Sequence, residues 1–195
     1  NMASNHTTNY QLCQWEATDK VLRTDFNEDN QKIDAALASL SSQIPLIRLK
    51  HFVLSADTKS YALDLEDVDL EDYSGLRFVI KSTANTIGTF GLRLNGLEEN
   101  YEYDSTSSYN PVSASAIPVC SVSPFLSQVD LRRFAAWTIF SVNSCVFRDD
   151  LVSSTWLRGL HRDVSYDNIQ SITLNNLHET DLLSAGTEIT AYGIK

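Results

Sequence analysis

The chain has 195 residues, of which 25 are acidic, 15 are basic and 43% are hydrophobic, and its formal net charge is −10. This composition supports one folded domain, or one domain with an appendage. The negative charge argues against nucleic acid and anionic membrane surfaces as partners, because both require a basic footprint. No apolar run approaches the length of a membrane span, and we expect no signal peptide.

The first element that the sequence predicts is a helix, which follows a polar segment at residues 1–13 where we expect no regular structure. Its apolar and amide positions recur every three or four residues, the seven-residue rhythm of a helix that packs on another helix. These positions, the predicted oligomerisation site, are Phe26, Asn30, Ile33, Leu37, Leu40 and Ile44. Thr24 is the candidate amino-terminal cap, and Pro45 ends the helix.

The apolar stripe of this helix needs a partner, because an isolated helix of about twenty residues is marginal in water. The partner is either further copies of the same helix or the β domain of the same chain, and the sequence leaves both open. In heptad notation the stripe alternates between position d, starting at Phe26, and position a, starting at Asn30. A polar Asn at one a position fixes the register and the number of helices.

After Pro45 the hydrophobic period changes to two, which predicts strands. The expected strands cover 46–54, 60–65, 76–80, 90–94, several short pieces within 117–134, then 134–147, 151–162, 169–174 and 188–194. Tyr101 and Tyr103 are expected to begin the strand that returns after a turn at Asn95-Gly96. The Ser-rich segment 104–116 is expected to be a surface loop.

Many strands without intervening helices predict a mainly β fold, an antiparallel β-sandwich of jelly-roll type. We therefore divide the chain into two parts. Residues 1–45 are an N-terminal tail and a helical oligomerisation stalk, and residues 46–195 are a β-sandwich head.

Two stretches of the β part could bind a ligand. The acidic run 64–72 contains six carboxylates, which suits calcium, but it lacks the glycine of an EF-hand loop. Its Leu65, Val68 and Leu70 are expected in the core, which favours a solvated acidic turn.

The second stretch places Trp156, Arg158 and Arg162 on one face of a strand, with His161 on the opposite face. An aromatic platform beside guanidinium donors can hold a sugar, although such side chains also cover sheet edges and subunit interfaces. We take these three residues as the candidate ligand-binding site.

No catalytic site is predicted. The sequence lacks a nucleophile elbow, a metalloprotease motif, a phosphate-binding glycine loop and a dinucleotide fingerprint. Its cysteines, Cys13, Cys120 and Cys145, form no C-x-x-C pair, so we expect neither a zinc site nor a redox pair. We therefore predict no enzyme, no cofactor and no metal.

Three passages resemble a known family. Residues 9–34, NYQLCQWEATDKVLRTDFNEDNQKID, resemble the opening of phage and prophage structural proteins from Gram-positive bacteria, in which such a segment leads into a helix and a β-rich head. Residues 184–194, SAGTEITAYGI, are similar to the ending of tail-fibre and receptor-binding-like heads, and residues 63–80 are similar to passages within those heads. About residues 95–165 have no recognised counterpart.

The resemblance implies a tail-associated virion protein, made in the bacterial cytoplasm, that forms a homotrimer and assembles with other virion proteins. A host cell-surface polysaccharide is its candidate receptor. Two alternatives stay open: a phage head decoration protein and, from another class, a carbohydrate-binding module or glycan-cleaving enzyme.

Overall fold

The computed structural model describes residues 3–83, 87–105, 112–122, 124–148, 151–178 and 181–195. The chain divides into two compact units, Asn1–Pro45 and Leu46–Lys195, which we call the helical unit and the β unit.

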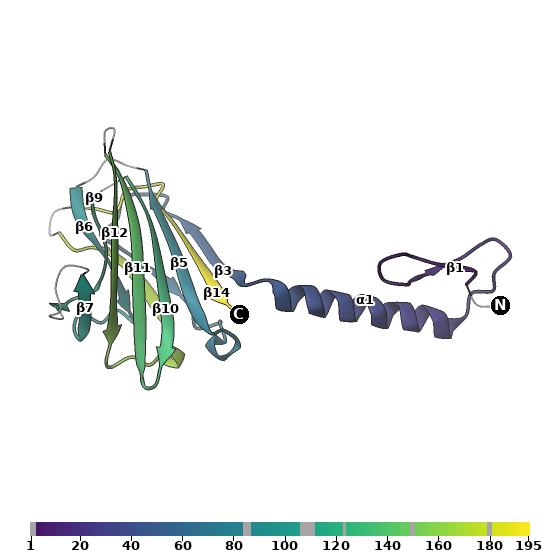
Figure 1. The fold of residues 1–195 in the computed structure, drawn as a ribbon. Coiled ribbons are helices and arrows are strands. Elements are labelled where there is room, and N and C mark those ends of the chain that lie inside the picture. The colour runs from purple at the N-terminus through teal and green to yellow at the C-terminus, as the bar shows by residue number, and fades with distance from the viewer. Residues whose placement is uncertain (1–2, 84–86, 106–111, 123, 149–150, 179–180) are drawn as a thin grey trace. The chain divides into compact units, whose positions relative to one another are not determined.

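The helical unit contains helix α1 (Arg23–Gln43) and a small hairpin in which β1 (Asn5–His6) pairs antiparallel with β2 (Cys13–Gln14) (Figure 1). The expectation that residues 1–13 lack regular structure is wrong. The loop of the hairpin is closed because Thr7 and Leu12 exchange hydrogen bonds, with the Thr7 N–H donating to the Leu12 carbonyl at 2.8 Å and the Thr7 hydroxyl accepting from the Leu12 N–H at 2.9 Å.

The predicted cap at Thr24 is also wrong. With Thr24 as the cap the helix would begin at Asp25, but α1 begins two residues earlier, at Arg23. Thr24 therefore lies in the first helical turn, where its hydroxyl donates to the neighbouring carboxylate of Asp25 at 3.3 Å.

The β unit consists of two antiparallel sheets, so the prediction of a mainly β fold is confirmed. The larger sheet has eight strands in the spatial order β3 (Leu46–Val53), β14 (Glu188–Ile194), β5 (Gly75–Ser82), β10 (Phe125–Phe134), β11 (Trp137–Arg148), β12 (Leu151–His161), β7 (Tyr101–Ser105) and β8 (Val112–Ala114). The smaller sheet has four strands in the order β4 (Ser60–Asp64), β13 (Ser171–Asn176), β6 (Ile87–Leu94) and β9 (Ile117–Val122). Two short 3-10 turns are η1 (Leu70–Asp72) and η2 (Tyr166–Asn168).

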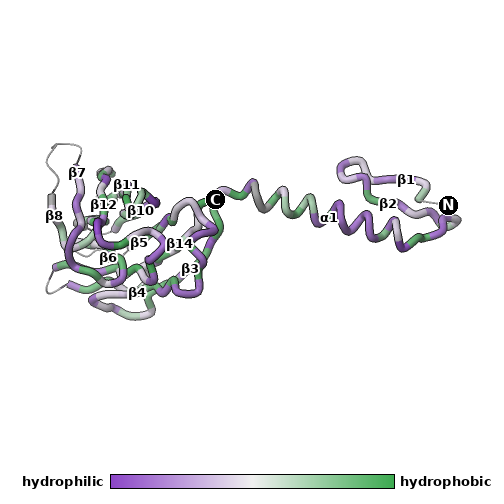
Figure 2. The backbone as a smooth tube through the Cα atoms, turned by 90° about the horizontal axis from the view of Figure 1, so that it is seen from below, coloured by the Kyte–Doolittle hydropathy of each residue, from purple (hydrophilic) through white to green (hydrophobic). Residues whose placement is uncertain are grey.

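Side chains from both sheets form one hydrophobic core. In β5 the alternate residues Leu76, Phe78 and Ile80 are fully buried, because successive side chains of a strand point to opposite faces. Leu92 and Leu174 enter the same core from the smaller sheet. Figure 2 shows the corresponding mixture of hydrophobic and hydrophilic residues along the strands.

Strand β7 departs from the predicted connectivity. The turn at Asn95 (φ 51°) and Gly96 (φ 71°) forms as expected, but β7 then pairs with β12 in the larger sheet and not with β6. A strand does begin at Tyr101, as predicted, but the prediction that it returns beside the strand before the turn is wrong. Buried Tyr101 links the end of β6 in the smaller sheet to β7 in the larger sheet, since its hydroxyl accepts a hydrogen bond from the Leu94 N–H at 2.7 Å.

The segment 104–116 is not a continuous loop. Its first two residues, 104 and 105, belong to β7. Near the end of the segment, β8 pairs with β7. Residues 106–111 lie outside the described part of the chain.

Buried His161 gives the β unit a predictable pH dependence. Its Nδ1 accepts hydrogen bonds from the backbone N–H groups of Asp163 (3.2 Å) and Val164 (3.1 Å), and its ring packs edge-on against Tyr101. Burial lowers the pKa of His161 below its ordinary value. Because the unfolded chain then binds this proton more tightly than the folded chain does, the free energy of unfolding should fall as the pH decreases through about 6.5.

We expect the variant His161→Gln to lose this part of the pH dependence. Urea unfolding of the native chain and the variant at several pH values between about 7.5 and 5.5 would measure it, with a smaller slope in the variant. Equal slopes would mean that His161 does not titrate with unfolding.

Candidate functional site

The predicted oligomerisation residues lie along one face of α1 and just beyond its end, and they are largely exposed. The exposed fractions of the apolar members are 58% for Phe26, 42% for Ile33, 60% for Leu37, 57% for Leu40 and 43% for Ile44. Asn30 is also exposed. A side chain of this size gains about 1.5–3 kcal/mol when it is fully buried. No described residue of the helical unit supplies that burial, so within this unit the stripe is an apolar surface without a partner.

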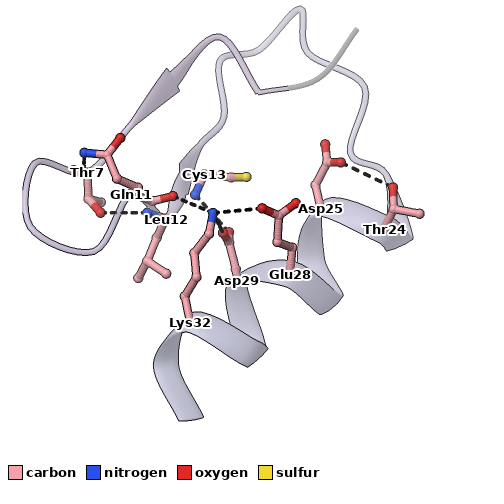
Figure 3. A network of polar contacts seen from close by, with 9 residues as sticks. All are labelled: Thr7, Gln11, Leu12, Cys13, Thr24, Asp25, Glu28, Asp29 and Lys32. Atoms are coloured by element: carbon pink, nitrogen blue, oxygen red, sulfur yellow. Dashed lines mark hydrogen bonds and ion pairs between the residues drawn. The ribbon is translucent and has the colours of Figure 1, made fainter. Parts of the chain in front are cut away.

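A different face of the same helix is covered by residues 3–22, which we call the N-terminal arm (Figure 3). The Cys13 N–H donates to the Asp29 carboxylate at 2.9 Å, and the Lys32 ammonium donates to the Gln11 carbonyl at 2.9 Å. The partly buried helix residues on this face are Asp25, Asp29, Lys32 and Ala36. At about 100° per residue, this face lies roughly a quarter turn from the apolar stripe.

The covered face carries a small charge network. The Lys32 ammonium lies 3.6 Å from the Asp29 carboxylate and 3.5 Å from that of Glu28. Burial acts to raise the pKa of Asp29, but the hydrogen bonds from Cys13 and the nearby Lys32 outweigh it, so this pKa is lowered. Burial and the adjacent Asp29 raise the pKa of the Cys13 thiol. Asp29 is therefore ionised and Cys13 is a neutral thiol near pH 7.

The β unit carries a groove of about 440 Å³ on the outer face of its larger sheet, across β10, β11, β12 and β7. Strand alternation builds this groove. Leu157 and His161 of β12 are buried, so the intervening Arg158 and Leu160 point outward, as does Trp156. The residues that line the groove are Glu102, Tyr103, Asp104, Asp130, Arg132, Ile139, Phe140, Ser141, Trp156, Arg158, Gly159 and Leu160.

The structure brings together two of the three predicted ligand-binding residues. Trp156 is 46% exposed, and the guanidinium carbon of Arg158 lies 5.7 Å from the centre of its ring. Arg162 does not line the groove. Its guanidinium makes two hydrogen bonds of 2.8 Å to the Glu102 carboxylate and lies over the ring of Trp137.

Asp104 is one of the groove residues that the sequence did not predict. It lies opposite Arg158 in the β7–β12 ladder, and its buried Oδ1 has no hydrogen-bond partner among the described residues. The other central carboxylate, Asp130, is already engaged by two hydrogen bonds of 2.7 and 2.8 Å from Arg77. The groove thus combines the carboxylate of Asp104 and the exposed ring of Trp156 with apolar residues that include Ile139.

The acidic run 64–72 lies outside the groove. Leu65 and Leu70 are buried and Val68 packs against the core, as predicted. The carboxylates of Asp64 and Asp69 accept hydrogen bonds from backbone N–H groups two residues further on, which is how Asp stabilises turns. In the described parts of the chain, no three His, Cys, Asp or Glu side chains gather in a way that could hold a metal ion.

No protein-family model and no curated protein matches this sequence. Within the described ranges, no helix combines the length and the apolar character that crossing a bilayer requires.

Proposed function

We propose that the chain is a structural protein of a phage or prophage virion, in which α1 forms a helical stalk that assembles three copies and the β unit forms a β-sandwich head. The exposed heptad stripe on α1 carries the proposal of self-association. The assignment to a virion, and to the tail in particular, is supported by the sequence resemblance of residues 9–34, 63–80 and 184–194.

The stripe favours further copies of α1 as its partner. Five large apolar side chains at alternating a and d positions are mostly exposed on one helix, and three such helices can bury them against one another. Asn30 favours a parallel, in-register arrangement. In that arrangement its amide can hydrogen-bond to the same amide of the neighbouring copies, whereas an antiparallel one would place it against apolar side chains.

The strand order supports a jelly roll as the fold of the head. The set β3-β14-β5-β10 faces the same core as the set β4-β13-β6-β9. Strands that follow one another in the chain cross between these sets from β3 to β4, from β4 to β5, from β5 to β6, from β9 to β10 and from β13 to β14. Eight strands divided in this way correspond to the double-sheet jelly roll, an architecture found in viral capsid and lectin domains. Strands β11, β12, β7 and β8 extend one of the two sheets.

Light scattering of the intact chain over a range of concentrations tests the assembly. We expect a particle of three times the 21.8 kDa chain mass. A single-chain mass at all concentrations would contradict the proposal. Mass spectrometry and immunoelectron microscopy of purified phage particles test where the protein lies in the virion. Antibody labelling of the phage capsid, and not of the tail, would favour the alternative of a decoration protein.

The groove supports a role of the head in attachment to a host-surface polysaccharide. The ring of Trp156 can stack on the apolar face of a sugar, and Arg158 and the Asp104 carboxylate, which line the same groove, can bond to its hydroxyl groups. A groove that stays open to solvent on an outer sheet face provides a weak contact. Three copies would strengthen such a contact by avidity.

We predict that Trp156→Ala weakens binding to cell-wall polysaccharide about tenfold, because it removes a large aromatic contact worth about 1.4 kcal/mol. Sedimentation of the protein with wall fractions from the host measures this effect. Trp137→Ala is the matched control, since Trp137 is 36% exposed but does not line the groove. Equal binding by both variants would contradict a role of the groove in attachment. Release of soluble sugar from the wall fractions by the native chain would favour a glycan-cleaving enzyme.

A further inference from the structure

We propose that the N-terminal arm shields a charge at the interface between copies, by holding Lys32 against Asp29 so that Asp29 does not repel Asp34 of the neighbouring helix. This inference rests on the proposed self-association of α1. It assigns a function to the arm and to Asp34, neither of which belongs to the apolar stripe.

The heptad register brings the two carboxylates together. With Phe26 at position d and Asn30 at position a, Asp29 takes position g and Asp34 takes position e. In parallel helices a g residue of one copy faces the e residue of the next copy that lies five positions further along. Asp29 of each copy therefore faces Asp34 of its neighbour. Like charges that meet in this way oppose association, and each chain already carries a net charge of −10.

The arm places positive groups on one member of this pair. The Asp29 side chain is only 15% exposed, because the arm lies over it. The Cys13 N–H donates to the carboxylate at 2.9 Å, and the Lys32 ammonium lies 3.6 Å from it. The negative charge of the ionised Asp29 is thus partly balanced within its own chain, before a second copy binds.

The arm also determines where the Lys32 ammonium lies. A lysine on a helix surface can extend into solvent, but here the ammonium donates to the Gln11 carbonyl at 2.9 Å (Figure 3). Gln11 has a positive φ of 55°, and its N–H donates to the Thr7 carbonyl at 3.1 Å. The closed loop of the hairpin therefore presents the Gln11 carbonyl to Lys32 and keeps the ammonium beside Asp29.

The test is Lys32→Gln in the full chain, with Lys20→Gln as the control. Lys20 belongs to the same arm and its replacement changes the net charge equally, but it lies outside the network of Figure 3. The Debye length exceeds roughly 20 Å in about 20 mM salt. Under that condition we expect the protein concentration at which half of the oligomer dissociates to be about tenfold higher for Lys32→Gln than for Lys20→Gln. In about 1 M salt, which screens beyond roughly 3 Å, the two variants should dissociate at the same concentration.

A second variant separates electrostatic repulsion from a simple loss of the folded arm. Asp34→Asn should restore assembly when it is combined with Lys32→Gln and should change little by itself, because Asp34 acts only when Asp29 is unshielded. Failure of this rescue, or equal behaviour of the two lysine variants in low salt, would overturn the proposal. If the native chain is monomeric in every salt, the proposed self-association fails as well, and that result is recognisable before any variant is made.

Discussion

The variant Leu37→Asp is expected to abolish the proposed self-association and leave only monomers. Leu37 lies in the middle of the stripe, at position a, and is 60% exposed in a single copy. Assembly of three helices would bury three copies of this side chain, each worth about 1.5–3 kcal/mol. Replacement by a carboxylate removes this burial and places three like charges together. The association constant should therefore fall by at least about a thousandfold.

Ala35→Asp is the matched control for this variant, because it introduces the same carboxylate into α1 on the side opposite the stripe. We expect it to leave the mass of the particle unchanged in light scattering. Circular dichroism of both variants would show whether the β unit stays folded. Monomers from both variants would indicate that any added charge in α1 prevents assembly, and trimers from both would show that the stripe is not the interface.

The helix and most of the strands could be predicted from sequence because each depends on a local period. The spacing from Phe26 to Ile44 repeats with the turn of a helix, and the alternation at Leu76, Phe78 and Ile80 repeats with the pleat of a strand. Elements that depend on distant partners could not be found in this way. The pairing of β7 with β12 joins residues that are 52 (Ser105 and Leu157) to 60 (Tyr101 and His161) positions apart in the chain, and no local pattern encodes that choice.

The same distinction explains what was missed at the candidate sites. Alternation along one strand placed Trp156 and Arg158 on the outer face, where the groove lies. It could not show that Glu102 would pair with Arg162, nor that Asp104 would lie opposite Arg158. The alternation of Tyr101 and Tyr103 with two acidic residues was the available signal for an outward Asp104, but its use required knowledge of the sheet to which β7 belongs.

The N-terminal arm was missed for a related reason. Its hairpin has only two residues in each strand, which is too short for a hydrophobic period to be visible. Contacts with α1 fix it in place, among them the hydrogen bond from the Cys13 N–H to Asp29. A segment that is held in place by another element has little sequence periodicity of its own. The polar composition of residues 1–13 therefore suggested an absence of regular structure.

Phe78→Ala is expected to destabilise the β unit by about 3–5 kcal/mol, a large part of the 5–15 kcal/mol that is usual for a folded domain. Phe78 is fully buried and lies on β5, between β14 and β10, where its Cα partners are Ala191 and Val129. Loss of its ring leaves a cavity beneath three central strands, which can close only partly. Chemical denaturation followed by circular dichroism would measure the effect.

Phe147→Ala is the matched control, because it deletes the same ring from a side chain that is 45% exposed. We expect it to cost less than about 1 kcal/mol. Both substitutions should be made in the Leu37→Asp background, since assembly would otherwise add a concentration-dependent contribution to the stability. A cost for Phe147→Ala as large as that for Phe78→Ala would contradict the assignment of the core. If the two units fold independently, Phe78→Ala in the native background should lower the stability of the β unit and leave self-association through α1 intact, which is the reverse of the effect of Leu37→Asp.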